Sequence, residues 1–215
     1  MKRVSVLSAG LATLLAACGP SVSLRVEQRS IKDLPLESRL DLLDAENDLF
    51  SAVDRRDDME AAIEDARAAV HKADGRVDEA DHNLDQAKDR KDQGGIDVGK
   101  LAVQEAKAHR TVQEWELKFA HKDLDVAEAQ LLVAEARFEK SKAEVAKKAK
   151  APGAAELKLP DFDKQVDRLQ LHVKDVQKEA DKTRKAAEKD QAKWQALSRQ
   201  LSELTGGAQG SAWVQ

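Results

Sequence analysis

The 215-residue sequence contains few of the side chains that fill the core of a globular domain. It has no tyrosine, three tryptophans and four phenylalanines, and much of its apolar content is alanine. With only four prolines and 35% charged residues, it has the composition of long helices rather than of a mixed αβ domain. So much charge is also compatible with a disordered chain. The regular spacing of the apolar residues argues against disorder and favours helices.

The sequence also lacks the motifs that nucleic-acid binding, catalysis and metal binding require. Its net charge is −4 with both signs interleaved, so it offers no basic surface to nucleic acid. No serine sits in a glycine-flanked elbow, and there is no glycine-rich phosphate loop. No two histidines lie three or four residues apart with a glutamate between them; the five are His71, His82, His109, His121 and His172. The sequence therefore predicts a protein that is not an enzyme and holds no cofactor or metal.

The single cysteine, Cys18, closes an N-terminal segment with the features of a secretion signal. A short positive start is followed by an apolar run over residues 4–14, which is too short to span a membrane as a mature helix. The segment ends in Leu15-Ala16-Ala17-Cys18. In position, length, charge and motif it resembles the precursor of a bacterial lipoprotein. That resemblance implies removal of residues 1–17, a diacylglycerol on the Cys18 sulfur and an acyl chain on its amine.

Two other interpretations of this segment stay open. Ala16 and Ala17 could precede the cut of an ordinary signal peptidase, and Cys18 could be a small buried hydrophobe. Under the lipoprotein resemblance, several acyl chains such as palmitate anchor the mature chain durably to the lipid bilayer. Gly19 stands where an aspartate often retains such proteins at the inner membrane, so the resemblance implies an outer-membrane protein that faces the periplasm.

Residues 18–35 lack a sustained period and contain serine, glycine and two prolines, which predicts an extended tether. The lipoprotein resemblance implies that this tether is lipidated at Cys18. A seven-residue repeat then runs over residues 36–92 and predicts a helix with one narrow coiled-coil seam. Alanine usually lies three residues after the large position of this repeat, which is occupied by Leu42, Leu49, Ile63, Val70, Val77 and Leu84. Gly94 and Gly95 follow a basic stretch, so we expect them to stop this helix and to form a distal turn that is open to a partner.

A second helix is expected over residues 97–149. It carries apolar stripes on two opposite sides and therefore needs two partners. A third helix over residues 161–204 supplies the second partner, and residues 206–215 are predicted to be a flexible tail. Residues 36–205 are thus expected to form one domain, which is an all-α, elongated, antiparallel three-helix coiled-coil array or bundle.

Matching large side chains to small ones gives a register for each pair of helices. Between the first and second helices, this register places Leu84 opposite Ala106. Between the second and third helices, it places Trp115 opposite Trp194. Asp190 then falls opposite Phe119, which makes that layer the poorest.

Two features of the membrane-near end are candidates for contact with other molecules. A widened apolar face would pack on the tether or on a second copy in a homo-oligomer, and it consists of Leu36, Leu40, Leu43, Phe50 and Val53. Lys147, Lys148 and Lys150 cluster at a turn, where they either contact anionic headgroups or complement the C-terminal end of a helix.

The sequence supports two functions of different classes. The first is a membrane-anchored structural spacer or interaction scaffold that meets an envelope protein or the cell wall. The alternative is an accessory subunit of an envelope transport or efflux assembly, similar in outline to the α-hairpins of periplasmic efflux adaptors but without their β-rich domains. A weaker third hypothesis is a membrane-shaping array similar to BAR domains, which would need a continuous basic face that the mixed charges here do not provide.

Overall fold

The computed structural model describes residues 20–32 and 34–206, and none of these residues lies in a strand. The helices are α1 (Arg29–Lys32), α2 (Leu36–Leu40), α3 (Leu43–Asp89), α4 (Gln93–Lys148), the short 3₁₀ helix η1 (Ala154–Glu156) and α5 (Leu159–Leu204). The all-α class predicted from the sequence is confirmed. Residues 1–17, Cys18 and residues 207–215 of the predicted tail lie outside the described residues.

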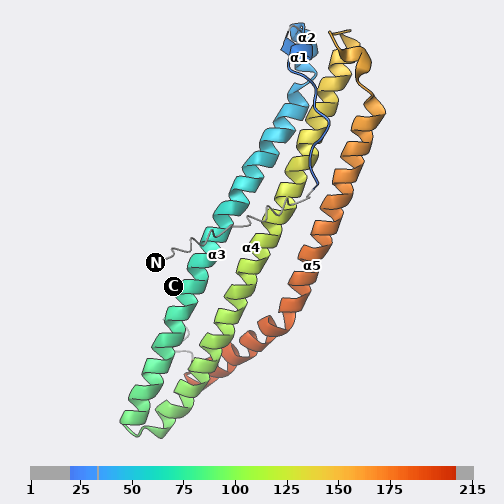
Figure 1. The fold of residues 1–215 in the computed structure, drawn as a ribbon. Coiled ribbons are helices and arrows are strands. Elements are labelled where there is room, and N and C mark those ends of the chain that lie inside the picture. The colour runs from blue at the N-terminus through green and yellow to red at the C-terminus, as the bar shows by residue number, and fades with distance from the viewer. Residues whose placement is uncertain (1–19, 33, 207–215) are drawn as a thin grey trace, which may run out of the picture.

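The three long helices lie side by side and antiparallel, with α4 in the middle (Figure 1). The 56 residues of α4 make a rod of about 84 Å, since each helical residue rises about 1.5 Å. We call the end that holds α1, α2 and the α4–α5 connection the proximal end. The end that holds the α3–α4 turn is the distal end (Figure 1).

The helices form an open array in which α3 and α5 each pack on α4. In the proximal half α3 and α5 leave a groove between them, which is lined by Asp48 of α3, Ala134 of α4 and Gln170 of α5. In its second half α5 bends and crosses α4 (Figure 1). The Thr183 hydroxyl donates to the Glu179 carbonyl oxygen at 3.0 Å, and such bonds to the preceding turn often accompany helix bends.

The sequence predicted a single helix over residues 36–92, but this segment forms two helices, because the helical backbone is interrupted at Asp41 and Leu42. Leu42 is buried at this break, in a cluster with Leu34 and Val145. The heptad seam predicted from the sequence is therefore present at the proximal end of α3.

The α3–α4 turn does not use the predicted glycines. The turn is Arg90, Lys91 and Asp92, and Lys91 takes the left-handed conformation with φ 56°. The amide of Lys91 donates to Lys88 and that of Asp92 to Ala87, which is the Schellman pattern with a lysine in the usual glycine position. Helix α4 therefore begins at Gln93 rather than at residue 97, and Gly94 and Gly95 lie in its first turn.

In α4 these glycines do not form a left-handed turn. They instead make room for the Asp92 side chain and for the end of α3. The Asp92 carboxylate accepts the Gly95 amide at 3.1 Å and caps α4. A side chain at Gly95 would place its Cβ 2.5 Å from Asp92 Oδ2 and 3.2 Å from the Ala87 Cβ. Gly99 similarly faces Leu84, whose Cα is 3.2 Å from the place of a Cβ.

The predicted α3–α4 register is wrong by one heptad. Leu84 lies against Gly99, which is seven residues nearer the turn than the predicted partner Ala106. Ala80 instead packs in one cluster with Val103 and Ala106. The same stripes meet in both registers, because a shift of seven residues preserves the seam. The tighter turn selects the observed register.

The predicted α4–α5 register is wrong by about one helical turn. Trp115 contacts Asp190 rather than Trp194, which is four residues farther along α5. At the proximal end Lys140 pairs with Asp163 at 2.6 Å. Pairing large with small apolar side chains predicted the wrong register because it ignored hydrogen bonding. The indole N–H of a packed tryptophan requires a hydrogen-bond acceptor, and Asp190 provides one for Trp115.

Within residues 20–32 and 34–206, no helix combines the length and the apolar character that crossing a bilayer requires.

We expect two glycine substitutions to have opposite effects on stability. Gly99→Leu should lower the free energy of unfolding by about 1–3 kcal/mol, because the new side chain would overlap Leu84. Gly75→Ala, at a position in α3 with no atom within 4 Å, should raise it by about 0.5–1 kcal/mol through helix propensity. Urea unfolding followed by circular dichroism measures both. A tolerated Gly99→Leu would contradict the observed register.

Candidate functional site

The segment 20–28, part of the predicted tether, lies along the helical array in an extended conformation (Figure 1). Val22 and Val26 are buried with exposures of 8% and 7%. Val22 packs in a cluster with Val133, Ala136, Val166 and Leu169, which come from α4 and α5. Val26 packs with Ala143 and Phe162 in the next cluster toward the proximal end. The extended backbone was expected. The alternative that placed the tether on the apolar face around Leu43 and Phe50 is wrong, because the segment docks on α4 and α5 and leaves those two side chains exposed.

Gln165 of α5 binds the backbone of this segment with both ends of its side-chain amide. Its Oε1 accepts the amides of Ser23 and Leu24, each at 2.8 Å, and the Ser23 hydroxyl at 3.0 Å. Its Nε2 donates to the Leu24 carbonyl oxygen at 3.3 Å. Gln165 is only 4% exposed, so these bonds replace water almost completely. The arrangement supplies what a neighbouring strand would supply in a sheet.

Glu139 of α4 continues the backbone contact. Its Oε2 accepts the Val26 amide at 2.7 Å, and its Oε1 accepts a hydrogen bond from the Lys142 ammonium at 2.8 Å. Glu139 is 9% exposed, and a buried carboxylate is tolerated only when it is paired and hydrogen-bonded. We call Glu139, Lys142 and Gln165 the clamp.

Two further contacts extend the clamp at either side. Arg168 donates to the Ser21 carbonyl oxygen at 2.9 Å, and the Ser30 hydroxyl donates to the Pro152 carbonyl oxygen at 2.8 Å. The segment is therefore held from Ser21 to Ser30 by side chains of α4 and α5 and by the α4–α5 connection.

A signal for this docking exists in the sequence. Val22, Leu24 and Val26 alternate with polar residues, which is the period of an extended strand with one buried face. Glu139 and Gln165 give no such signal, because charged and amide residues are common on helix surfaces. Only the packed structure brings these two side chains to the same segment.

The segment enters the array from its side and not from its end. Val22 lies at the level of Ala136, which is twelve residues before the end of α4 at Lys148. The proximal end of the rod thus extends about 18 Å beyond this level.

A second polar contact joins α4 and α5 near the distal end. Trp115 Nε1 donates to Asp190 Oδ2 at 2.9 Å, and Trp194 Nε1 donates to Glu105 Oε1 at 2.7 Å. Each helix thus contributes one tryptophan and one carboxylate. Asp190, which the sequence placed in the poorest layer, is the partner of an indole.

His109 lies beside this contact. Its ring centroid is 4.9 Å from that of Trp194, and its Nδ1 is 3.5 Å from Arg76 Nη1. Burial lowers the pKa of His109 below its ordinary value of 6.5, and the positive charge of Arg76 lowers it further.

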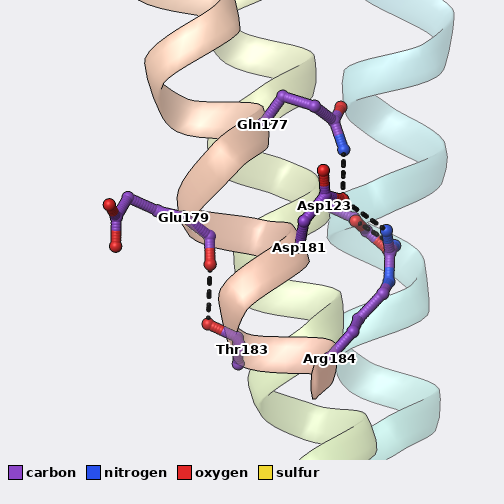
Figure 2. Close-up of polar contacts among 6 residues, drawn as sticks. All are labelled: Asp123, Gln177, Glu179, Asp181, Thr183 and Arg184. Atoms are coloured by element: carbon purple, nitrogen blue, oxygen red, sulfur yellow. Dashed lines mark hydrogen bonds and ion pairs between the residues drawn. The ribbon is translucent and has the colours of Figure 1, made fainter. Parts of the chain in front are cut away.

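Between the two ends an ion pair links α4 to α5. Figure 2 shows Arg184 of α5 reaching across to Asp123 of α4, with which it bonds at 2.6 and 2.8 Å. Gln177 bonds to Asp181 within α5, at 3.1 Å (Figure 2). These contacts are exposed and contribute little to stability.

The structure describes most of the other residues singled out from the sequence. Lys147 donates to the Leu157 carbonyl oxygen at 2.6 Å, and Lys148 pairs with Asp41 at 2.7 Å. Lys150 is exposed and takes the left-handed conformation, with φ 52°, at the end of α4. Headgroup contact by these lysines stays a prediction, and Cys18 lies outside the described residues.

The described part of the chain contains no group of three or more His, Cys, Asp or Glu side chains placed to hold a metal ion. Every buried side-chain nitrogen or oxygen in residues 20–32 and 34–206 has a hydrogen-bond partner. The clamp is therefore the candidate functional site, and its role is to bind backbone.

The sequence matches no protein-family model, and it matches none of the curated proteins and none of the solved structures with which it was compared.

We expect Gln165→Leu to release the N-terminal segment. The amides of Ser23 and Leu24 lose their acceptor, which should cost about 1–3 kcal/mol. Hydrogen exchange of residues 22–26 should become faster while that of α4 stays unchanged. Gln177→Leu is the matched control, because its amide bonds only to Asp181 on its own helix. Equal protection in both variants would contradict the clamp.

We expect His109 to make the distal contact sensitive to acid. Because its pKa is lowered in the folded state, the unfolded chain binds the proton more readily, so stability falls as the pH drops through 6.5 toward the folded pKa. Between pH 7.5 and pH 5.5, the melting temperature of His109→Gln should fall by less than that of the wild type. The exposed His71→Gln variant should behave as the wild type does. An equal fall in melting temperature on acidification in all three proteins would contradict this role of His109.

Proposed function

We propose that this chain is a membrane-anchored coiled-coil lipoprotein of the bacterial cell envelope that acts as a structural spacer or interaction scaffold. The proposal places acylated Cys18 in the outer membrane, with the helical array in the periplasm. The observation that carries it is the clamp, because the segment that directly follows Cys18 is fastened to the rod by buried hydrogen bonds.

A clamp on this segment has a clear use if Cys18 is acylated. A free tether of about fifteen residues would leave the rod to diffuse at the end of a flexible leash. A docked segment instead fixes the position of the rod relative to its anchor. Buried Val22 and Val26, together with Gln165 and Glu139, then carry any load between membrane and rod.

The composition of the described surface suits a scaffold. The long helices carry many surface ion pairs within one helix, such as Lys88 with Asp85 and Lys182 with Glu179, which keep a long rod soluble. The exposed turn Arg90–Asp92 lies at the end of a rod of about 84 Å. In this proposal the turn is the part presented to an envelope protein or to the cell wall.

Lipid labelling in cells tests the anchor. Radiolabelled palmitate should enter the wild-type protein and should not enter Cys18→Ser, because the chain contains no other cysteine. The wild type should fractionate with the outer membrane. Equal labelling of the two proteins, or release of the wild type as a soluble periplasmic protein, would overturn the proposal.

A further inference from the structure

Four large apolar side chains on α2 and α3 are left exposed at the proximal end. Their exposed fractions run from 45% to 64%, and they are Leu36, Leu40, Leu43 and Phe50. Leu43 and Phe50 are one heptad apart, so they lie on one line of the α3 surface. Helix α3 meets α4 with a different line, to which the buried Leu42 belongs. The docked N-terminal segment leaves the four side chains uncovered. We call these four residues the apolar stripe.

The apolar stripe lies in the same part of the rod as the entry of the N-terminal segment. Lys148, the last residue of α4, pairs with Asp41 at 2.7 Å, between the two ends of the stripe. Asp48 lines the groove beside Val133, and Val133 also packs with Val22. The stripe therefore extends from the proximal end to about the level of Val22.

The closed clamp leaves only a short length of chain between the rod and Cys18. Cys18 precedes Pro20, the first described residue, by two positions, a span of at most about 8 Å. Beyond the level of Val22 and Ala136, α4 continues for about 18 Å to the proximal end. A rod that stood upright on an acylated Cys18 would push this end into the bilayer. With the clamp closed, the rod must therefore tilt, so that one side of its proximal end meets the membrane surface while its distal turn remains away from the membrane.

We propose that the apolar stripe inserts into the interface between headgroups and acyl chains of the membrane that holds Cys18. This inference rests on the proposed lipid anchor. Amphipathic helices lie in this interface with large aliphatic and aromatic side chains buried a few ångströms deep. The stripe thus gives the rod a second contact with the membrane and fixes the side toward which it tilts.

The charges beside the stripe select the kind of lipid. The exposed charges beside the stripe nearly cancel, because Glu37, Asp41 and Asp44 lie near Arg39 and near Lys148, which pairs with Asp41. This region therefore has no strong electrostatic attraction to an anionic surface. The partner is therefore a zwitterionic lipid surface, and burial of apolar area drives the contact. A second copy of the chain fits the stripe less well. Four side chains fall far short of the roughly 800 Å² per partner that a stable protein interface buries.

A fluorescent probe on the stripe tests the contact in the mature, membrane-extracted protein. Leu43→Cys carries an environment-sensitive fluorophore, and the protein is reconstituted into phosphatidylethanolamine–phosphatidylcholine vesicles that contain brominated lipid. The control is Asp48→Cys, since this exposed residue of the same helix lines the groove instead of the stripe. We expect a blue shift and a loss of emission at position 43, and neither change at position 48.

The outcomes separate this inference from the lipid anchor itself. Emission that is not quenched at position 43, or equal quenching at positions 43 and 48, overturns the membrane contact even when palmitate labels Cys18. A blue shift without quenching that grows with protein concentration overturns it in favour of a second copy. The wild type treated with the fluorophore checks the anchor separately, because only an unacylated Cys18 would be labelled.

Discussion

The burial of α4 on two opposite sides is the constraint on which the rest of the structure depends. Alanine on one side lets α3 approach closely, as at Ala127, which is 1% exposed. Alanine on the other side does the same for α5, as at Ala129 and Ala136. With two close neighbours and no large core, the helices form a thin array whose length far exceeds its width. An array of this kind leaves shallow grooves between its helices, and one of them receives the N-terminal segment.

The clamp links this architecture to the proposed function. An extended segment needs partners for its amides, and a helical protein offers none from its own backbone. Gln165 and Glu139 supply those partners from helices α5 and α4. Because both side chains are buried, leaving either one without its hydrogen bonds to the segment would cost free energy. The hydrogen bonds and the packing of Val22 and Val26 therefore form together. A proposed anchor at Cys18 would thus act on the whole array and not on a loose tether.

Glycine and tryptophan mark the places where simple rules predicted a wrong register. A pair of glycines after a basic stretch usually signals a helix stop, yet here a lysine makes the turn and the glycines allow close packing. Pairing by size placed two tryptophans together, yet each indole N–H binds a carboxylate on the facing helix. In both cases the apolar side chains would pack in the predicted register as well as in the observed one. Local hydrogen bonds decided which of the two registers forms.

The sequence alone determined the all-α class, the three long helices and the two apolar stripes on α4, because a period of seven residues places apolar side chains on fixed lines of a helix. Matching side-chain sizes selected the wrong register for both helix pairs, since a shift by a heptad or by one turn keeps the same stripes in contact. Only the tertiary structure decided the registers, through the Lys91 turn and the Trp115–Asp190 bond. The clamp also came from the tertiary structure, because Glu139 and Gln165 lie far from residues 22–26 in sequence and meet them only after the helices pack.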